Sequence, residues 1–523
     1  MKKVIRFFGL FLGLALAGSL FVQAQEELPL KLTLEDCILR TIQNNLGVSV
    51  QKLNPEISAT ALSKSKEKFY PTIQFGYTRR SNINPSYSGL EAVESYETDY
   101  NDVNGQISQF IPFGGTLNVS LDTYKSSTTQ NYQTWNPRYY STLRFDFSQP
   151  LLQNFGLDIS RKEIIIANKG LESSLAQTEL ALMNTINSSE QSYWNLVYAI
   201  EDLKVKQESL KLARELLAKN QRSVEIGTLA PLDVLSAQSE VATREADIIR
   251  AEVAVKNAED QLWILMNLPE DEKKQYTSIV PVDTPKYEQK AISLEEAESV
   301  ALANRPDLRN LKISTDTQQF NLKVAKNQLL PALNLVASYY SPGLSGDRLV
   351  YLDNNPLTGI IVDKIPGPRS QSLKDAFRFK YENWSVGLTL NIPLSNAISR
   401  ASVAQARLNL QQAELNLKQQ EQQAMLEVKT ALRTVEANLH SVQAYKAARE
   451  LQEQKLAAEE EKLRVGQSTN YTVLQYQRDL AAAQSSELKA IIDYNVSVAN
   501  LEKTLGLSLK NRNIRLVELT NSN

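Results

Sequence analysis

Apolar side chains recur at steps of three and four residues over long stretches of the chain. The clearest series is Met425, Val428, Leu432, Val435, Leu439 and Val442. This spacing is typical of the seam of a coiled coil. Because no Gly or Pro occurs between Arg400 and Val465, the pattern predicts one helix of roughly 100 Å. Shorter helices are expected from about Val473 to Leu505 and over 35–69 and 295–330.

Two other regions alternate apolar residues with polar or small ones. The segments are LNVSLDTY from Leu117, LRFDFSQ from Leu143, LNLVASYY from Leu333 and WSVGLTLNI from Trp384. Strands of about ten residues with this alternation are typical of a transmembrane β-barrel, which places apolar side chains toward lipid and polar ones toward a wet lumen. The core of a soluble β-sandwich is the alternative. We expect strands over 71–80, 139–149, 332–340 and 383–392, a possible extra hairpin over 105–112 and 115–124, and an acidic loop over 90–102.

Both patterns occur twice in the same order. The segment LEDCILRTIQNN at 34–45 matches LEEAESVALANR 260 residues later, and ISRKEIIIANKG at 159 matches ISRASVAQARLN 239 residues later. The second match also places Gly227 on Gly466. The sequence therefore predicts a tandem duplication. Its expected parts are repeat 1 (25–268, with a strand insert at 71–149), a linker (269–292), repeat 2 (293–507, with a strand insert at 332–392) and a tail (508–523).

Four strands from one chain cannot close a barrel. Lipid tolerates no open sheet edge, and a closed barrel needs about eight strands or more. Several copies must therefore combine their strands. In each repeat the two short helices would stack end to end beside the long one, so that the helices of the assembly form a hollow cylinder.

Composition narrows the class of protein. A hydrophobic content of 42% and a formal net charge of -2 exclude a disordered chain and a strongly basic nucleic-acid binder. The single cysteine, Cys37, and the single histidine, His440, leave too few side chains for most metal or nucleophile sites. We therefore expect no cofactor, no metal and no enzymatic activity, and interpret Cys37 as a buried helical thiol.

The N-terminus reads MKKVIRFFGLFLGLALAGSLFVQAQ. Basic residues, an apolar run and a small-residue cleavage site predict a secretory signal peptide over 1–24. A membrane anchor is the alternative, although the apolar run is short for a spanning helix.

Together these motifs resemble the TolC-like outer membrane efflux family. The resemblance rests on the duplicated segments above, on the helix-to-strand passage YPTIQFGY, on the strand-to-helix passages FSQPLLQNFG and LNIPLSNAISR, and on VEIGTLAPLDVLS (224–236) and LRVGQSTNYTVLQ (463–475). It implies a homotrimer that is mainly α-helical, with a barrel of about twelve strands in the outer membrane continuous with a helical tunnel through the periplasm.

The same resemblance implies a function. Such a protein is a passive channel that exports small molecules or polypeptides, as in type I secretion, together with a periplasmic adaptor and an inner-membrane transporter. The alternative is a trimeric coiled-coil structural or adhesive protein of the cell surface. That alternative predicts one uninterrupted register, whereas this chain has duplicated helix pairs with strand inserts.

The two Gly motifs are where the resemblance assigns roles. Gly227 and Gly466 are expected to end their helices in the left-handed conformation that Gly adopts without strain. In the family these turns dock the adaptor, and the residues that follow narrow the pore. By resemblance, the adaptor-binding residues are Ile226, Gly227, Thr228, Val465, Gly466 and Gln467, and the pore-gate residues are Asp233, Thr472 and Gln475.

The gate of this chain departs from the family pattern. Well-known members have acidic residues where Thr472 and Gln475 stand, so that three copies form rings of carboxylates. Asp233 is the remaining acid, and it would help to close the tip if it paired with Arg464 or Lys462. Its other interpretation is an acid favoured by the dipole at a helix N-terminus.

Overall fold

The computed structural model describes residues 28–86, 93–287 and 293–514. The expected signal peptide and the end of the tail lie outside the described residues. The chain divides into two compact units, one made of Met1–Lys52, Thr178–Arg305 and Gln423–Asn523, the other of Leu53–Gln177 and Pro306–Gln422. Most of the described chain is helical, as predicted.

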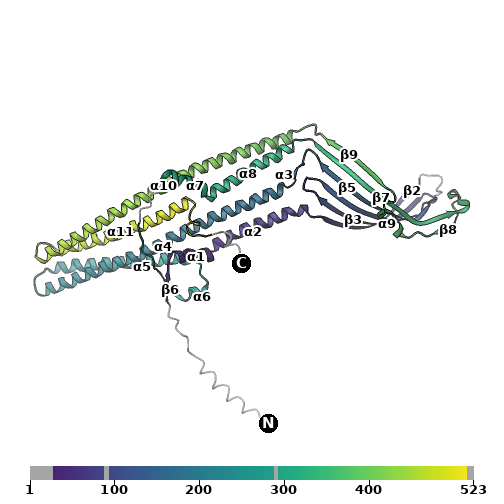
Figure 1. Ribbon diagram of the computed structural model, residues 1–523. Helices are drawn as coiled ribbons and strands as arrows, with labels where there is room; N and C mark the ends of the chain where they lie inside the picture. Colours follow the sequence, from purple (N-terminus) through teal and green to yellow (C-terminus); the bar gives the residue numbers. More distant parts are fainter. Residues whose placement is uncertain (1–27, 87–92, 288–292, 515–523) are drawn as a thin grey trace, which may run out of the picture. The chain divides into compact units, whose positions relative to one another are not determined.

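The first unit contains the helical hairpins (Figure 1). Its own elements are β1 (Leu28–Leu32), α1 (Leu34–Asn44), α5 (Pro231–Met266), α6 (Glu270–Lys273), β6 (Tyr276–Pro281), α7 (Leu294–Asn304) and α11 (Asn470–Thr504). Three helices have residues in both units, namely α2 (Leu46–Lys66), α4 (Lys162–Glu225) and α10 (Ala397–Arg464). The predicted long helix is confirmed as α10, with 68 residues, and its counterpart α4 has 64.

Short helices meet end to end in both repeats, as expected. Helix α5 ends at Asn267, which adopts a positive φ of 42° and donates from Nδ2 to the Asn44 carbonyl at the end of α1 (2.9 Å). In the second repeat Gly506 follows α11 with a φ of 75°, and a Cβ there would lie 2.9 Å from the Asn304 carbonyl oxygen at the end of α7. The chain thus uses the left-handed conformation at both helix ends, with Asn in one repeat and Gly in the other.

A small parallel sheet escaped the sequence analysis. Strand β1 pairs with β6, and the expected linker over 269–292 therefore contains both α6 and a strand. Leu32 and Ile279 of this sheet pack in one core cluster with Tyr193 of α4 and with Cys37 of α1. The interpretation of Cys37 as a buried helical thiol is confirmed, and burial raises its pKa to about 11.

The second unit holds a mixed-length antiparallel sheet in the order β2–β3–β4–β5–β7–β8, with β9 also paired to β7. Since β5 occupies one edge of β7, β8 and β9 must share the other, β9 beside Ala332–Tyr340 and β8 beside Arg348–Tyr351. The strands are β2 (Thr72–Pro85), β3 (Ser95–Phe110), β4 (Thr116–Thr128), β5 (Trp135–Pro150), β7 (Ala332–Tyr351), β8 (Ile361–Ile365) and β9 (Asn383–Asn391). The helices are α3 (Leu157–Ser160), α8 (Pro306–Asn327) and α9 (Arg369–Phe377), with 3₁₀ turns η1 (Glu67–Phe69), η2 (Leu352–Asn354) and η3 (Pro356–Thr358).

The extra hairpin belongs to the sheet. Strands β3 and β4 lie between β2 and β5, so the described chain contributes more than the expected four strands to its sheet. Adding a hairpin keeps every neighbour antiparallel, which explains why the sheet accepts it. The acidic loop expected over 90–102 is also corrected in part, because 95–102 belong to β3 and 87–92 lie outside the described residues.

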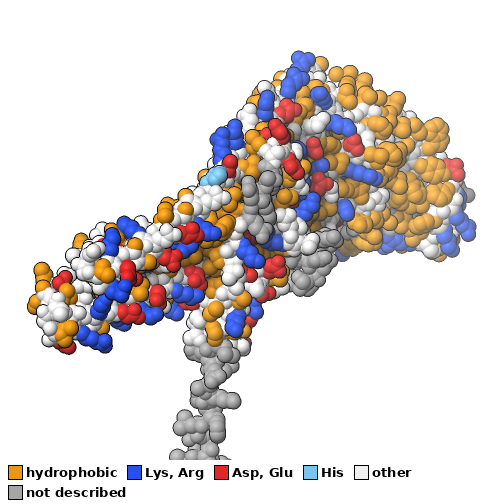
Figure 2. All heavy atoms as spheres, turned by 60° about the vertical axis from the view of Figure 1, so that its left-hand side comes forward, with side chains coloured by type: hydrophobic (Ala, Val, Ile, Leu, Met, Phe, Trp, Pro, Cys, Tyr) orange, Lys and Arg blue, Asp and Glu red, His pale blue; other side chains and the backbone are white. Residues whose placement is uncertain are grey.

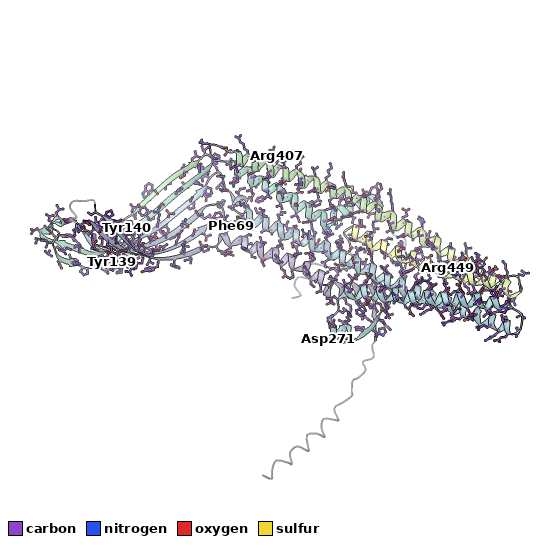
Figure 3. All side chains as sticks on the ribbon, turned by 180° about the vertical axis from the view of Figure 1, so that it is seen from behind. Phe69, Tyr139, Tyr140, Asp271, Arg407 and Arg449 are labelled. Atoms are coloured by element: carbon purple, nitrogen blue, oxygen red, sulfur yellow. The ribbon has the colours of Figure 1, made fainter. Side chains whose placement is uncertain are left out.

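Side chains alternate between two faces of this sheet. We call one the apolar face; it carries Ile73, Phe75 and Tyr77 of β2 and Trp384, Val386, Leu388 and Leu390 of β9, all exposed. The polar face carries their neighbours, such as Gln74, Thr78, Ser385 and Thr389. Figure 2 shows hydrophobic side chains gathered over the strands, and Figure 3 shows Tyr139 and Tyr140 toward the end of the sheet far from Phe69. The expected alternation is confirmed.

Candidate functional site

Two helical hairpins of the first unit turn side by side, α4 into α5 and α10 into α11 (Figures 1 and 3). Gly227 has a φ of 75° and Gly466 a φ of 78°, so the predicted left-handed conformation is confirmed. In each turn the Gly amide donates to the carbonyl three residues earlier in the chain. The amide of the following residue donates to the carbonyl five residues before that residue: Thr228 to Ser223 and Gln467 to Lys462, both at 2.8 Å. This is the Schellman pattern that ends helices at Gly.

The second helix of each hairpin begins differently. Helix α5 starts with Pro231, and Ala230 before it provides no side-chain cap. Helix α11 starts after Thr469, whose hydroxyl accepts from the Thr472 amide at 3.3 Å. Ser468 adds a further bond to this turn by donating to the Glu459 carboxylate at 2.6 Å, which lowers the pKa of Glu459.

The six residues assigned to adaptor binding form the two turns. Ile226 is 74% exposed and Val465 is 57% exposed, and the remaining four residues are exposed as well. Large apolar side chains beside them are also open to water, namely Leu232, Leu235 and Tyr471. Clustered apolar side chains in water indicate a surface that another molecule covers.

A core cluster joins the two hairpins just behind the turns. Its buried members come from all four helices: Ala213, Leu216, Ala237, Leu456, Val473, Leu474 and Leu480. The two hairpins therefore pack as one body near the tip, and a change in one is felt by the other.

Arg244 of α5 lies inside this body. Its side chain is only 5% exposed and bonds Glu240 on its own helix. It also donates to the Ser209 carbonyl of α4 (2.6 Å) and to the Leu474 carbonyl of α11 (3.1 Å). Burial lowers the pKa of Arg244 from its usual value, but a guanidinium remains charged at any physiological pH.

Glu240 extends this network across the hairpins. Its second oxygen accepts from Nη2 of Arg478 on α11 at 2.6 Å, and this bond raises the pKa of Arg478. The buried Glu240 carboxylate thus accepts hydrogen bonds from Arg244 of the first repeat and from Arg478 of the second. Farther from the turns Arg449, labelled in Figure 3, forms an ion pair with Glu487 that joins α10 to α11 within the second hairpin.

The gate residues from the sequence are only partly brought together. Gln475 lines a groove between α5 and α11 with Leu235, Ser236, Ser239, Glu240, Tyr471, Leu474 and Arg478. Thr472 instead belongs to the cap of α11, where its hydroxyl lies 2.9 Å from that of Thr469. Asp233 lies in the first turn of α5.

The two bases considered as partners of Asp233 form ion pairs within their own helix in the single chain. Arg464 pairs with Glu461, and Lys462 pairs with Glu459 at 3.2 Å, both within α10. An ion pair between residues three apart on one helix forms without any tertiary contact. Arg464 and Lys462 therefore pair with these local carboxylates.

Sequence reasoning missed the buried network around Arg244. The signal was present, because Glu240 and Arg244 are four residues apart on one helix. That spacing usually indicates an exposed ion pair, and only the packing of three helices shows that this one is buried.

The described ranges (28–86, 93–287 and 293–514) contain neither a metal-binding cluster nor a helix that could span a membrane. No cluster of His, Cys, Asp or Glu there is suited to holding a metal ion. No helix there is both long enough and apolar enough to cross a membrane.

Comparison with known proteins agrees with this architecture. The chain resembles the Campylobacter jejuni CmeC outer membrane channel, with 16% identity, a TM-score of 0.61, and coverage of 91% of this chain and 86% of that one. It also resembles the open state of the Neisseria gonorrhoeae MtrE outer membrane channel, with 18% identity, a TM-score of 0.57, and coverage of 91% and 89%.

Sequence comparison adds a relative and a family. Toxin and drug export protein A of Aggregatibacter actinomycetemcomitans is 25% identical over 179 residues, which are 34% of this chain and 37% of that protein, so the match spans well under half of the relative. Residues 110–268 and 298–507 match the family described as Outer membrane efflux protein. These ranges include both hairpin turns and most of the sheet. The chain therefore belongs to the outer membrane efflux protein family, and its location is the outer membrane.

Proposed function

We propose that three copies of this chain form a passive channel that exports cargo across the periplasm and the outer membrane. The observation that carries the proposal is the sheet, which has an open edge at β2, another at β9 with β8 beyond it, and an apolar face open to water in the single chain. Such a sheet is stable in a membrane only when its edges are paired. A second and third copy of the same chain supply the missing pairs.

Strand direction fits this closure. Five successive antiparallel pairings lead from β2 to β9, so these two edges run in opposite directions. The β9 edge of one copy can therefore pair antiparallel with the β2 edge of the next. Six strand positions from each of three copies would give a barrel of eighteen strands, with the apolar face toward lipid and the polar face toward the lumen.

The hairpin turns would form the periplasmic entrance. The exposed apolar side chains around Ile226 and Val465 suit a docking surface for a periplasmic adaptor, which in turn would connect to an inner-membrane transporter. Asp233, Thr472 and Gln475 would line the narrow part of the entrance. The buried bonds of Arg244 and Glu240 would keep the two hairpins of one copy together while copies move against each other.

The cargo would be small molecules or polypeptides. The Aggregatibacter relative is named for both toxin and drug export, and its name therefore fits either class of cargo. A passive tunnel selects little by itself, so the transporter would determine which class is exported.

Purified protein in a planar lipid bilayer tests the proposal. We expect a trimer in detergent by light scattering, and discrete conductance steps when the trimer is added to the bilayer. A water-soluble monomer, or a trimer that inserts without conductance, would contradict the channel. A matched preparation lacking β9 (residues 383–391) should fail to form the trimer, because it removes one of the two sheet edges.

A further inference from the structure

Helix α9 lies on the apolar face of the sheet. The Ser372 hydroxyl is 2.9 Å from that of Ser141 on β5, and Ser345 of β7 donates to the Pro368 carbonyl at 2.8 Å. Ser141 and Ser345 have the same parity as Phe145 and Tyr339, whose side chains are on the apolar face. The helix therefore covers part of that face, over β5 and β7.

The sheet is shaped to receive this helix. Along the apolar face of β7, the large residues Leu333, Leu335 and Tyr339 give way to Ser341, Gly343 and Ser345. A Cβ on Gly343 would lie 1.9 Å from the Ser372 carbonyl oxygen. No larger residue fits there, and the close approach shows that α9 is an integral part of the sheet surface.

The helix lies just beyond the apolar band. Phe379, which follows α9, packs on Tyr339 and Phe145 with ring centroids 5.6 and 6.3 Å apart. The apolar stretch from Leu333 to Tyr339 measures roughly 20 Å along the strand at 3.4 Å per residue. Since this band would face the hydrocarbon, α9 is at the height of the lipid headgroups. Exposed Phe377, Tyr381 and Trp384 are the aromatic residues expected at that boundary.

The exposed side of α9 is basic. Asp375 is buried and already bonds Gln371 and the Lys380 ammonium, the latter at 3.0 Å. Lys374 and Arg378 are exposed, and neither forms an ion pair with a residue in the described part of the chain. They are neighbours on one turn, because the Arg378 amide donates to the Lys374 carbonyl at 2.9 Å.

Lys374 lies in the last turn of α9 and Arg378 is its C-cap residue, so two positive charges meet at this exposed helix end. A phosphate group suits the pair, since a guanidinium forms two parallel hydrogen bonds with it and an ammonium adds a point charge. We propose that Lys374 and Arg378 of α9 bind the phosphate groups of an anionic glycolipid in the outer leaflet of the membrane. This site rests on the membrane placement of the sheet proposed above, but it does not depend on export.

Native mass spectrometry of the detergent-solubilised trimer tests the site. The probes are diphosphoryl lipid A, monophosphoryl lipid A and inorganic phosphate. We expect the diphosphoryl form to bind most tightly and inorganic phosphate not to compete at equal phosphate concentration. Lys374→Gln with Arg378→Gln should weaken the affinity about 30-fold, because each basic residue near a charged lipid surface contributes about 1 kcal/mol.

The chain offers a matched control. Lys429 and Arg433 are also exposed and four residues apart, but they lie on α10 in the first unit. Lys429→Gln with Arg433→Gln should leave lipid A affinity unchanged, and exchanging the α9 pair (Lys374→Arg with Arg378→Lys) should retain most of it.

Equal lipid A affinity in the wild type and the α9 double variant would overturn the proposal. Competition by inorganic phosphate as strong as that by lipid A would also overturn it, because the site would then be a free-anion site. If the double variant does not assemble, lipid A retention by the wild-type trimer at increasing salt concentration tests the proposal instead. Retention of lipid A that is unaffected by high salt would contradict binding through charge.

Discussion

The two hairpin turns have the same backbone conformation but differ in the side chains that stabilise it. Both place Gly in the left-handed region and both form the same pair of Schellman bonds. The α10–α11 turn adds a Thr469 cap and the bond from Ser468 to Glu459. The α4–α5 turn has Ala230 and Leu229 at the positions of Thr469 and Ser468, and neither offers a side-chain hydroxyl.

This difference shows which contacts stabilise each hairpin. The α10–α11 turn is fixed locally by its own hydroxyls, whereas α5 is fixed farther from the turn by the buried Arg244, which reaches α4 and α11. The position of Arg244 in the second repeat is Ala483, so this support is not duplicated. Arg244 thus supports the first hairpin at a position where the second hairpin has no counterpart.

Replacing the buried Arg244 should have the largest effect on the free energy of unfolding. Arg244→Met leaves the Ser209 and Leu474 carbonyls without their donor and weakens the hold on Glu240, so we expect a loss of about 3 kcal/mol. Arg478→Met is the matched control, because Arg478 bonds the same carboxylate but its side chain is 63% exposed. It should cost roughly 0–1 kcal/mol. Thermal unfolding of the detergent-solubilised trimer, followed by circular dichroism, compares them; similar losses would mean that burial of Arg244 does not matter.

Replacing the turn glycines tests what the hairpins share. Gly227→Val and Gly466→Val should each cost at least about 1–2 kcal/mol locally, because an L residue with a side chain resists a positive φ. Nothing lies within 4 Å of a Cβ at either position, so the cost is conformational and should be similar in both turns. Gly170→Val is a control at an equally open position without positive φ.

If the turns dock an adaptor, Gly466→Val should also reduce export while trimer and membrane insertion remain. Drug susceptibility of cells that carry only the variant, at equal protein level, measures this. Unchanged susceptibility would argue against a role of this turn in docking, even where the local unfolding prediction holds.

Local signals explain which parts of the fold were predictable. The three- and four-residue spacing predicted α10, and the Gly motifs predicted the conformation of Gly227 and Gly466, because each depends on neighbours in the sequence. Alternation predicted β2, β5, β7 and β9 and indicated the extra hairpin, but it missed β8 and the first half of β3. The β1–β6 pair was missed because the two strands are distant in the chain and parallel, and no local pattern records such a pairing.

The candidate site was less predictable for the same reason. The location of the turns follows from the resemblance, but the burial of Arg244 depends on three helices meeting around it. Helix α9 was missed as well, because nine residues between two strands give too short a pattern to distinguish a helix from a loop. Its position on the apolar face becomes visible only through Gly343 and the serines beside it.

Substitutions at the N-cap positions of α5 and α11 should reveal a smaller difference in stability between the two turns. Thr469→Ala removes a side-chain cap and should cost about 1 kcal/mol. Ala230→Thr places the same residue before α5, where no cap exists, and should stabilise that turn by a similar or smaller amount. Amide hydrogen exchange in the first turn of α5 and of α11 reports each effect separately. If Thr469→Ala leaves exchange in α11 unchanged, the hydroxyl bond to the Thr472 amide does not stabilise the turn.

The smallest effect is expected at Asp233, which stands where the second repeat has Thr472. With Arg464 and Lys462 paired on their own helix, an Asp233→Asn change should remove only the favourable interaction of the carboxylate with the N-terminal dipole of α5, about 0.3–1 kcal/mol. Thr472→Asp is the reciprocal change, since it places an acid in the first turn of α11.

Electrostatics in the pore gives this pair of variants a second measurement. Three carboxylates around a narrow axis bind multivalent cations strongly, whereas Thr472 and Gln475 offer only neutral groups. We therefore expect weak block by trivalent cations from the periplasmic side in the wild type, no block in Asp233→Asn, and stronger block in Thr472→Asp. Single-channel recordings of the three forms distinguish the cases. Tight block of the Asp233→Asn form would place the constriction on other residues, and Glu240, which lines the groove beside Gln475, would then be the next position to change.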